Sequence, residues 1–386
     1  MQQPIASVVL NGKFIAQSVT GVQRFARELL VAVDRLLDEE RWTTKVPFVL
    51  ALPAGHADAV PALARIEVRE FSAGRLHFWE QCRLPGNSRD ALLINLAGSA
   101  PLFKRGQICT FHDAAIFDVP GAYSALFTSW YRVLFRIQSR LSRRVLTVSE
   151  FSRERLSHHL RISPEKIGVV PNGASHVDRV SADDTVLQRI GVQHGRYLLA
   201  VGSDNPSKNF PALLAAFGAL DSADTQLVVV GGRNKAVFST TSDTDVVEDR
   251  RIIRAGRVND AELKALYSHA RAFIFPSLYE GFGIPPLEAM SAGCPVLAGN
   301  AASIPEVCGD AVGYFDPRDL DSIRAALERA VVDDGWIEGL RIAGRAHVAR
   351  FTWTRAADAL LSELAALGVV RASIPSSEKR HQLAHQ

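Results

Sequence analysis

Short apolar runs of strand length alternate with amphipathic stretches along most of this chain, and this alternation limits the possible folds more than any other feature. Most of these runs are apolar throughout, which is typical of strands in a parallel sheet covered by helices on both faces. The first series of runs is Ile5–Leu10, Phe48–Leu52, Ala91–Asn95, Ile108–Phe111, Val145–Val148 and Ile167–Val170. The second series is Tyr197–Gly202, Gln226–Val230, Ile252–Ala255, Ala272–Phe275 and Pro295–Ala298. The pattern predicts an α/β protein.

Two separate series of runs predict two doubly wound domains, each with its own parallel sheet. We expect an N-terminal domain over residues 1–178 and a C-terminal domain over residues 189–350, joined by the polar stretch Ser175–Gln188. Ligands of such folds bind where the carboxyl ends of the strands meet a common cleft. An amphipathic helix is expected over Thr352–Leu367, within a C-terminal segment of about residues 352–370. Residues 371–386 are polar and lack an apolar period, so we expect them to be disordered.

Composition excludes several classes of protein. A net charge of +3 over 386 residues is too small to indicate a nucleic-acid partner. No apolar stretch approaches the roughly 20 residues that a membrane-spanning helix needs, and the N-terminus lacks the pattern of a signal peptide. The four cysteines are scattered and form no C-x-x-C pair, which is typical of reduced thiols in a cytoplasmic protein.

Two carboxylates, Glu280 and Glu288, bracket a loop rich in glycine and proline that follows one of the expected strands. Gly281 and Gly283 would let the backbone come close to a ligand. Pro286 can begin a helix, which would place Glu288 in the first turn of that helix, and its N-terminal amides would favour a diphosphate. The alternative is a surface turn in which a glutamate only stabilises the start of a helix.

This region resembles the signature of the retaining glycosyltransferases of family 4, which have the GT-B fold of two Rossmann-like domains facing each other across a cleft. The matching residues are Glu280-Gly281-Phe282-Gly283, then Glu288-Ala289-Met290-Ser291-Ala292-Gly293-Cys294-Pro295-Val296, and further on Ile304-Pro305-Glu306-Val307-Cys308-Gly309-Asp310-Ala311. The resemblance implies that the donor, a nucleotide diphosphate sugar, is held by Glu280, Gly281, Phe282, Gly283, Ile284 and Glu288. It also implies that the turn carrying Glu306 closes over the donor, and that the C-terminal helix crosses back to the N-terminal domain.

Matches to the family extend into the N-terminal half. Thr20-Gly21-Val22-Gln23-Arg24 resembles the family's glycine loop, so Gly21 and Val22 are expected to present backbone amides to the donor phosphates. A helix start capped by Thr20 is a compatible interpretation. Thr110-Phe111-His112-Asp113 resembles the segment whose histidine approaches the donor sugar, although a single histidine is often no more than a satisfied polar group. Thr147–Ser152 and Val170–Gly173 also match, and we interpret them as turns and caps.

A loop over residues 202–209 resembles the one that holds the diphosphate in the family. Lys208 corresponds to the expected lysine, whereas Ser203 stands where many members carry an arginine. A subset of the family shares this serine, so the difference does not indicate an inactive protein. Arg257, followed by Val258, is a candidate for the second cation, and a surface charge is the alternative.

The resemblance implies a metal-independent hexosyltransferase that acts with retention at the anomeric carbon. The acceptor would be a saccharide or a polyprenyl-linked saccharide in surface polysaccharide synthesis, and GDP-mannose is the first candidate donor. Glu280, His112 and Lys208 would act at the reacting sugar and its leaving diphosphate, and Glu288 would bind the ribose. Neither a metal nor an organic cofactor is expected, because no D-x-D metal motif appears in a suitable βα loop, and Asp243-Thr244-Asp245 has the composition of a solvated loop.

Several alternatives stay open from the sequence. Rhamnosyl- and glucosyltransferases share the fold, and so do some nucleotide-sugar epimerases and phosphorylases. A binding module without activity would not need all four of Glu280, Glu288, Lys208 and His112. A dehydrogenase is disfavoured because no G-x-G-x-x-G follows the first expected strand.

The amphipathic stretch Ser124–Arg144 suggests contact with a membrane. Arg132, Arg136, Arg140 and Arg143 recur at helical spacing, so this face could dock on anionic lipid at the inner side of the cytoplasmic membrane. The alternative is the solvated face of a packed helix.

Overall fold

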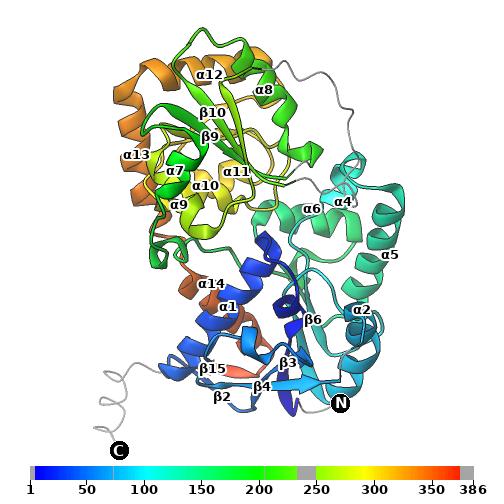
Figure 1. Ribbon diagram of the computed structural model, residues 1–386. Helices are drawn as coiled ribbons and strands as arrows, with labels where there is room; N and C mark the ends of the chain where they lie inside the picture. Colours follow the sequence, from blue (N-terminus) through cyan, green and yellow to red (C-terminus); the bar gives the residue numbers. More distant parts are fainter. Residues whose placement is uncertain (1–4, 73, 204, 233–248, 374–386) are drawn as a thin grey trace, which may run out of the picture.

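The computed structural model describes residues 5–72, 74–203, 205–232 and 249–373, which form two lobes, each built around a parallel sheet (Figure 1). Among these residues, the N-terminal sheet has the strand order β4-β3-β1-β5-β6-β7-β8, and the C-terminal sheet has the order β11-β10-β9-β12-β13-β14. This is the GT-B architecture that the sequence predicts.

The strands agree closely with the apolar runs. The N-terminal sheet consists of β1 (Ser7–Asn11), β3 (Phe48–Pro53), β4 (Ile66–Phe71), β5 (Ala91–Asn95), β6 (Gln107–Thr110), β7 (Arg144–Thr147) and β8 (Ile167–Val169). The C-terminal sheet consists of β9 (Tyr197–Val201), β10 (Gln226–Val230), β11 (Ile252–Gly256), β12 (Ala272–Phe275), β13 (Val296–Gly299) and β14 (Gly313–Phe315). Strands β4 and β14 were not expected, since each combines few apolar residues with charged or exposed positions.

Helices cover both sheets, and their loops at the carboxyl ends of the strands meet between the lobes (Figure 1). In the N-terminal lobe they include α1 (Gly21–Asp38), α2 (Leu76–Phe78), α3 (Leu84–Asn87), α4 (Ala115–Asp118), α5 (Ala125–Leu141) and α6 (Glu150–Leu160). In the C-terminal lobe they include α7 (Thr185–Ile190), α8 (Phe210–Gly218), α9 (Asp260–His269), α10 (Ile284–Ser291), α11 (Ile304–Cys308), α12 (Leu320–Val332) and α13 (Asp334–Val348).

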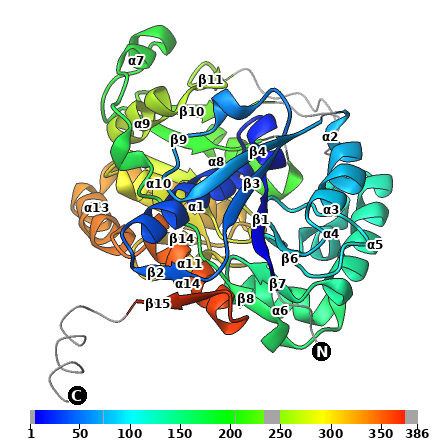
Figure 2. The ribbon, with the colours of Figure 1, turned by 90° about the horizontal axis from the view of Figure 1, so that it is seen from below.

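The last helix, α14 (Trp353–Ala366), returns from the C-terminal lobe and packs beside α1, as the colours at the two ends of the chain show (Figures 1 and 2). Its buried face includes Leu360, Leu361 and Leu364. Thr352 caps it by accepting a hydrogen bond from the Arg355 amide. The predicted crossing of the C-terminal helix is therefore confirmed.

The prediction of a disordered tail from residue 371 was wrong at its start. Val370–Ala372 form strand β15, which pairs antiparallel with β2 (Trp42–Thr44). The pairing uses backbone groups and buries Val370, so it needs no apolar period in the sequence. Residues 374–386 lie outside the described part of the chain.

The edge strand β4 is held by a buried carboxylate on α1. Asp34 is 6% exposed, and its oxygens accept hydrogen bonds from the amides of Ala64, Arg65 and Ile66 at 2.8–2.9 Å. These three bonds fix the start of a strand whose own side chains are mostly exposed.

Replacing Asp34 by alanine is therefore expected to destabilise the protein by about 2–3 kcal/mol, because hydrogen bonds to charged groups are among the stronger ones. Urea denaturation measures the difference. The matched control is Asp38→Ala, an exposed aspartate at the end of the same helix, which should change stability by less than about 0.5 kcal/mol. Equal effects of the two substitutions would contradict this account of β4.

A candidate active site between the two sheets

The loop between β12 and α10 carries Glu280, and α10 itself carries Glu288. Helix α10 begins at Ile284, two residues earlier than predicted, directly after Gly283 with its φ of +97°. Glu288 is consequently the fifth residue of the helix rather than a member of its first turn, which corrects the prediction. Its carboxylate is largely buried, with 9% of the residue exposed.

The glycines of this loop are required by protein contacts. A Cβ at Gly281 would lie 2.4 Å from the carbonyl oxygen of His112 in the other lobe, and one at Gly283 would lie 2.6 Å from Ile304. Gly281 therefore lets the loop pack on the other lobe, and Gly283 lets it pack on α11 of its own lobe. Their close approach to a ligand stays a prediction. Phe282, between them, is buried and contacts Phe351.

Lys208 and Glu280 meet at the carboxyl edge of the C-terminal sheet. The Lys208 ammonium lies 2.6 Å from the Glu280 carboxylate and 5.7 Å from the centre of the Phe275 ring. Both side chains are mostly shielded from solvent, with 22% and 13% exposed. The structure thus brings together two of the predicted site residues as an ion pair.

His112 follows strand β6 in the N-terminal lobe, and its backbone carbonyl oxygen lies against Gly281, the residue after Glu280. Its Nε2 lies 2.9 Å from the carbonyl oxygen of Leu96, which can only accept, so Nε2 carries the proton and Nδ1 is the free acceptor. Burial lowers the pKa of His112 to about 4. The imidazole is therefore neutral at physiological pH, so its Nδ1 can accept a hydrogen bond but the ring carries no positive charge.

The start of α1 lies close to the carboxylate loop, the segment over residues 276–283 that carries Glu280 and leads into α10. Gly21 is its first residue, and a Cβ there would lie 3.8 Å from Ile284 at the start of α10. One interpretation of the sequence expected Thr20 to cap α1. The Thr20 side chain does not do so, because its hydroxyl donates to the side chain of Gln23. The amides of Gly21 and Val22 are accordingly not taken up by a capping side chain.

The remaining candidates lie at the carboxyl ends of β9 to β11. Ser203 follows β9 and is partly buried. Arg257 is exposed, and its side chain lies against Gly232, where a Cβ would approach the Arg257 Nε to 2.6 Å. Val258 packs on the apolar core and anchors the turn that presents Arg257.

Contacts between the lobes converge on the carboxylate loop. The carbonyl oxygen of Gly281 accepts hydrogen bonds from Ser149 (2.6 Å) and Ser152 (3.1 Å) at the start of α6. Ser149 also caps α6, as predicted, but its role between the lobes was not visible in the sequence.

Glu306 makes a second contact between the lobes. Its carboxylate accepts hydrogen bonds from the amides of Glu150 and Phe151, at 2.8 and 2.9 Å. The carboxylate thus binds the N-terminus of α6, and closure of this turn over a donor stays a prediction.

Asp118 anchors a third contact between the lobes. The hydroxyl of Tyr279, one residue before Glu280, donates to it at 2.8 Å. Partial burial by itself would raise the pKa of Asp118, but hydrogen bonds from Arg155, His159 and Tyr279 lower it to about 2. The carboxylate therefore stays charged and ties the loop to the N-terminal lobe.

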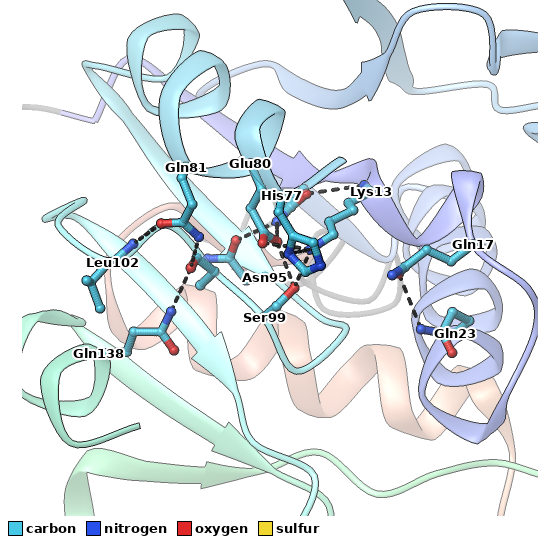
Figure 3. A network of polar contacts seen from close by, with 12 residues as sticks. Lys13, Gln17, Gln23, His77, Glu80, Gln81, Asn95, Ser99, Leu102 and Gln138 are labelled. Carbon is cyan, nitrogen blue, oxygen red and sulfur yellow. Dashed lines mark hydrogen bonds and ion pairs between the residues drawn. The ribbon is translucent and has the colours of Figure 1, made fainter. Parts of the chain in front are cut away.

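A buried polar network that sequence reasoning missed lies in the N-terminal lobe (Figure 3). The Lys13 ammonium is 2.8 Å from Glu80, and both residues are at most 3% exposed. Lys13 also donates to Ser99, and Asn11 donates to Glu80. Glu80 sits in a π-helical turn over Trp79–Arg83, a distortion that often marks functional regions. The network fixes the loop between β1 and α1. In the sequence, the only indication of this network is that Asn11 and Lys13 stand at the end of a predicted strand.

No group of three or more acidic, histidine or cysteine residues within the described ranges is arranged to hold a metal ion. The Asp243-Thr244-Asp245 sequence lies outside those ranges.

Of the four arginines that the sequence singled out, Arg136 and Arg140 are exposed on α5, whereas Arg132 and Arg143 are half-buried. The Arg132 side chain donates to the carbonyl oxygen of Ile116 and, like Arg136, packs over the Phe117 ring. Arg143 lies beyond the end of the helix. None of the helices among the residues described is both long and apolar enough to span a membrane.

The fold is that of the GT-B glycosyltransferases. Residues 86–176 match the model of Glycosyltransferase Family 4, and residues 188–345 match that of Glycosyl transferases group 1. The chain belongs to the family 4 glycosyltransferases, as its motifs implied.

Individual proteins agree with this assignment. The O-antigen chain mannosyltransferase B of Escherichia coli is 29% identical over 361 residues, which is 88% of this chain and 94% of that protein. Sucrose-phosphate synthase from Thermosynechococcus elongatus has a TM-score of 0.70 at 18% identity and covers 95% of this chain and 99% of its own. Anabaena HepE, solved with UDP and glucose, has a TM-score of 0.66 at 15% identity, with 94% and 100% covered.

The contribution of the buried Lys13–Glu80 ion pair to the stability of the protein can be tested. Lys13→Met leaves Glu80 buried without its cation and should cost about 3–5 kcal/mol of stability, whereas the double variant Lys13→Met, Glu80→Leu should recover much of that loss. Chemical denaturation measures both, with the exposed Lys45→Met as control. A single variant as stable as the wild type would show that the pair contributes nothing.

Proposed function

We propose that this enzyme transfers a mannosyl group from a nucleotide diphosphate sugar, with GDP-mannose as the first candidate, to a saccharide or polyprenyl-linked saccharide acceptor. Transfer would proceed with retention at the anomeric carbon, as part of surface polysaccharide synthesis. The observation that carries the proposal is the Lys208–Glu280 ion pair at the carboxyl edge of one sheet, next to Gly281, which packs on the backbone of His112 from the other lobe.

Lys208 would hold the leaving diphosphate. An incoming diphosphate carries more charge than one carboxylate and would compete with Glu280 for the ammonium. A cation at this place stabilises the charge that grows on the leaving group in the transition state. The amides of Gly21 and Val22 at the start of α1, together with Arg257, would add to the same stabilisation.

Glu280, once released from Lys208, would bind hydroxyls of the donor sugar and stabilise the positive charge that develops on its ring. His112 would accept a hydrogen bond from the sugar at Nδ1, since its other nitrogen is bound to Leu96. We assign neither residue as a general base or a covalent nucleophile.

The nucleoside would lie further along the loop. Glu288 would accept hydrogen bonds from the ribose hydroxyls, and Phe282, Gly283 and Ile284 would line the path between ribose and diphosphate. Ser203 and Val258 would border it from the neighbouring strand ends.

Relatives favour mannose as the transferred sugar, because the Escherichia coli relative that covers most of the chain is a mannosyltransferase. Rhamnose and glucose donors are the next candidates. A thermal-shift screen of GDP-, UDP- and dTDP-sugars identifies the donor, since a cognate ligand stabilises the protein by mass action.

Glu280→Ala and Lys208→Met are each expected to lower kcat by about 10²–10³, the usual cost of removing one charge-stabilising group from an active site. Radiolabelled sugar transfer measures the loss, and Glu338→Ala, an exposed glutamate on α13, is the control. Wild-type transfer should persist in excess EDTA. Near-normal turnover by Glu280→Ala would refute the assignment, and sugar conversion without acceptor would instead support an epimerase.

Membrane contact is proposed through a surface that differs from the arginine face. Leu126, Trp130 and Val133 lie at positions i, i+4 and i+7 of α5 and are 83%, 57% and 50% exposed. Trp130 also lines a groove of about 670 Å³ together with Phe103, which is 79% exposed, and with Lys104 and Arg105. Exposed apolar side chains beside cations are typical of proteins that lie on anionic membranes.

Combined substitution of Leu126, Trp130 and Val133 by serine should abolish sedimentation with vesicles that contain phosphatidylglycerol. Lys104→Glu with Arg105→Glu should weaken binding to these vesicles in a salt-dependent way. Ile342→Ser, which changes an equally exposed apolar residue on α13, is the control. Vesicle binding that survives both sets of changes would exclude this surface.

A further inference from the structure

Two residues to which the sequence assigned no role, His176 and Trp353, form a chain of hydrogen bonds that ends at the buried carboxylate of Glu288. His176 Nε2 lies 2.9 Å from Glu288 Oε1, and Trp353 Nε1 lies 3.2 Å from His176 Nδ1. His176 is 4% exposed and Trp353 is 2% exposed. The three side chains therefore form a chain of hydrogen bonds away from solvent.

The chemistry of the tryptophan fixes the direction of both bonds. An indole N–H can only donate, so His176 Nδ1 must be the acceptor and carries no proton. In a neutral imidazole the proton is then on Nε2, which donates it to the Glu288 carboxylate. His176 thereby has one defined tautomer and donates to Oε1 of Glu288, so this bond does not use the second oxygen of the carboxylate.

These residues also occupy the two places where the chain passes between the lobes. His176 lies in the segment that leaves the N-terminal sheet after β8, and Trp353 is the first residue of the returning helix α14. Trp353 further packs on Gly173, where a Cβ would lie 2.5 Å from its amide nitrogen. The position of the Glu288 carboxylate is thus tied to both crossing segments.

A charged group also lies near the oxygen of Glu288 that His176 contacts. Arg24 of α1 is 3.9 Å from Glu288 Oε1, but its guanidinium is already bonded to Asp260 at 2.6 Å. Of these neighbours, His176 makes the shorter and directional contact with Glu288.

We propose that Trp353 and His176 are positioning residues that orient Glu288 for recognition of the ribose hydroxyls of the donor nucleotide. The inference rests on the proposed role of Glu288 at the ribose and extends it to residues of the crossing segments. Trp353 sets the tautomer of His176, and His176 sets the direction of the carboxylate.

Two substitutions of similar size separate positioning from packing. In His176→Gln the amide nitrogen can take the place of Nε2 and donate to Glu288, whereas in His176→Asn the shorter amide reaches only the place of Nδ1. Trp353→Phe keeps an aromatic ring but removes the indole N–H that donates to His176 Nδ1. A purely structural role would make the Gln and Asn variants similar.

The measurement is the dissociation constant of GDP and UDP, each compared with its 2′,3′-dideoxy analogue, by titration calorimetry on the full chain. We expect the wild type to bind the ribose form at least about tenfold more tightly. This ratio should stay near the wild-type value in His176→Gln and fall about fivefold or more in His176→Asn and in Trp353→Phe. His176→Asn and Trp353→Phe should also raise the donor KM with little change in kcat, because ribose binding is equal in the ground and transition states.

Glu288→Ala distinguishes the two levels of the argument. If Glu288→Ala keeps the full preference for ribose, or if neither diphosphate binds the wild type, the proposed role of Glu288 fails and this inference fails with it. If Glu288→Ala loses the preference while His176→Asn and Trp353→Phe both keep it, only the positioning role is overturned. Equal losses in the Gln and Asn variants would overturn it as well.

Discussion

The packing of one glycine against the opposite lobe holds the site together. Gly281 places its Cα against the backbone of His112, and its carbonyl oxygen is bonded by Ser149 and Ser152. Any side chain at this position would push the lobes apart, since even a Cβ would come within 2.4 Å of an oxygen. The distance between the donor-side carboxylates and His112 therefore depends on this contact.

Carboxylates near the carboxyl ends of the strands have different partners. Glu280 is paired with Lys208 and Asp118 with Arg155, whereas Glu288 accepts a hydrogen bond from His176. Such partners offset the cost of holding a charge away from water. Asp113 differs, because its carboxyl oxygen accepts a hydrogen bond from the Ala115 amide and burial raises its pKa.

Particular elements show why sequence reasoning reached some parts of the molecule and not others. Strands such as β10 and β12 were predicted to the residue, because they are buried on both faces and their composition reports it. Strand β4 was missed because it lies at an edge and carries exposed charges, and Asp34, which holds it, is 32 residues away from Ile66. Strand β15 was assigned to a disordered tail because backbone pairing with β2 leaves no mark in its composition.

The same distinction applies to the candidate site. Glu280, Lys208, Gly21 and His112 could be selected because each stands at a strand end or helix start within a recognisable motif. The partners of Glu288 could not, since His176 and Trp353 lie 112 and 65 residues away from it in sequence (65 being 353 minus 288). No motif linked Lys13 to Glu80 either, although their pair is among the most buried in the protein.

The sequence by itself determined the fold class, the two sheets and the chemical type of the site, because buried strands and strand-end motifs are local properties of the chain. Only the tertiary structure decided what the loop glycines face, which groups fix the charge and tautomer of the site residues, and which surface of α5 is open. Those properties depend on which distant segments come into contact, and contact, burial and hydrogen-bond direction are properties of the folded chain.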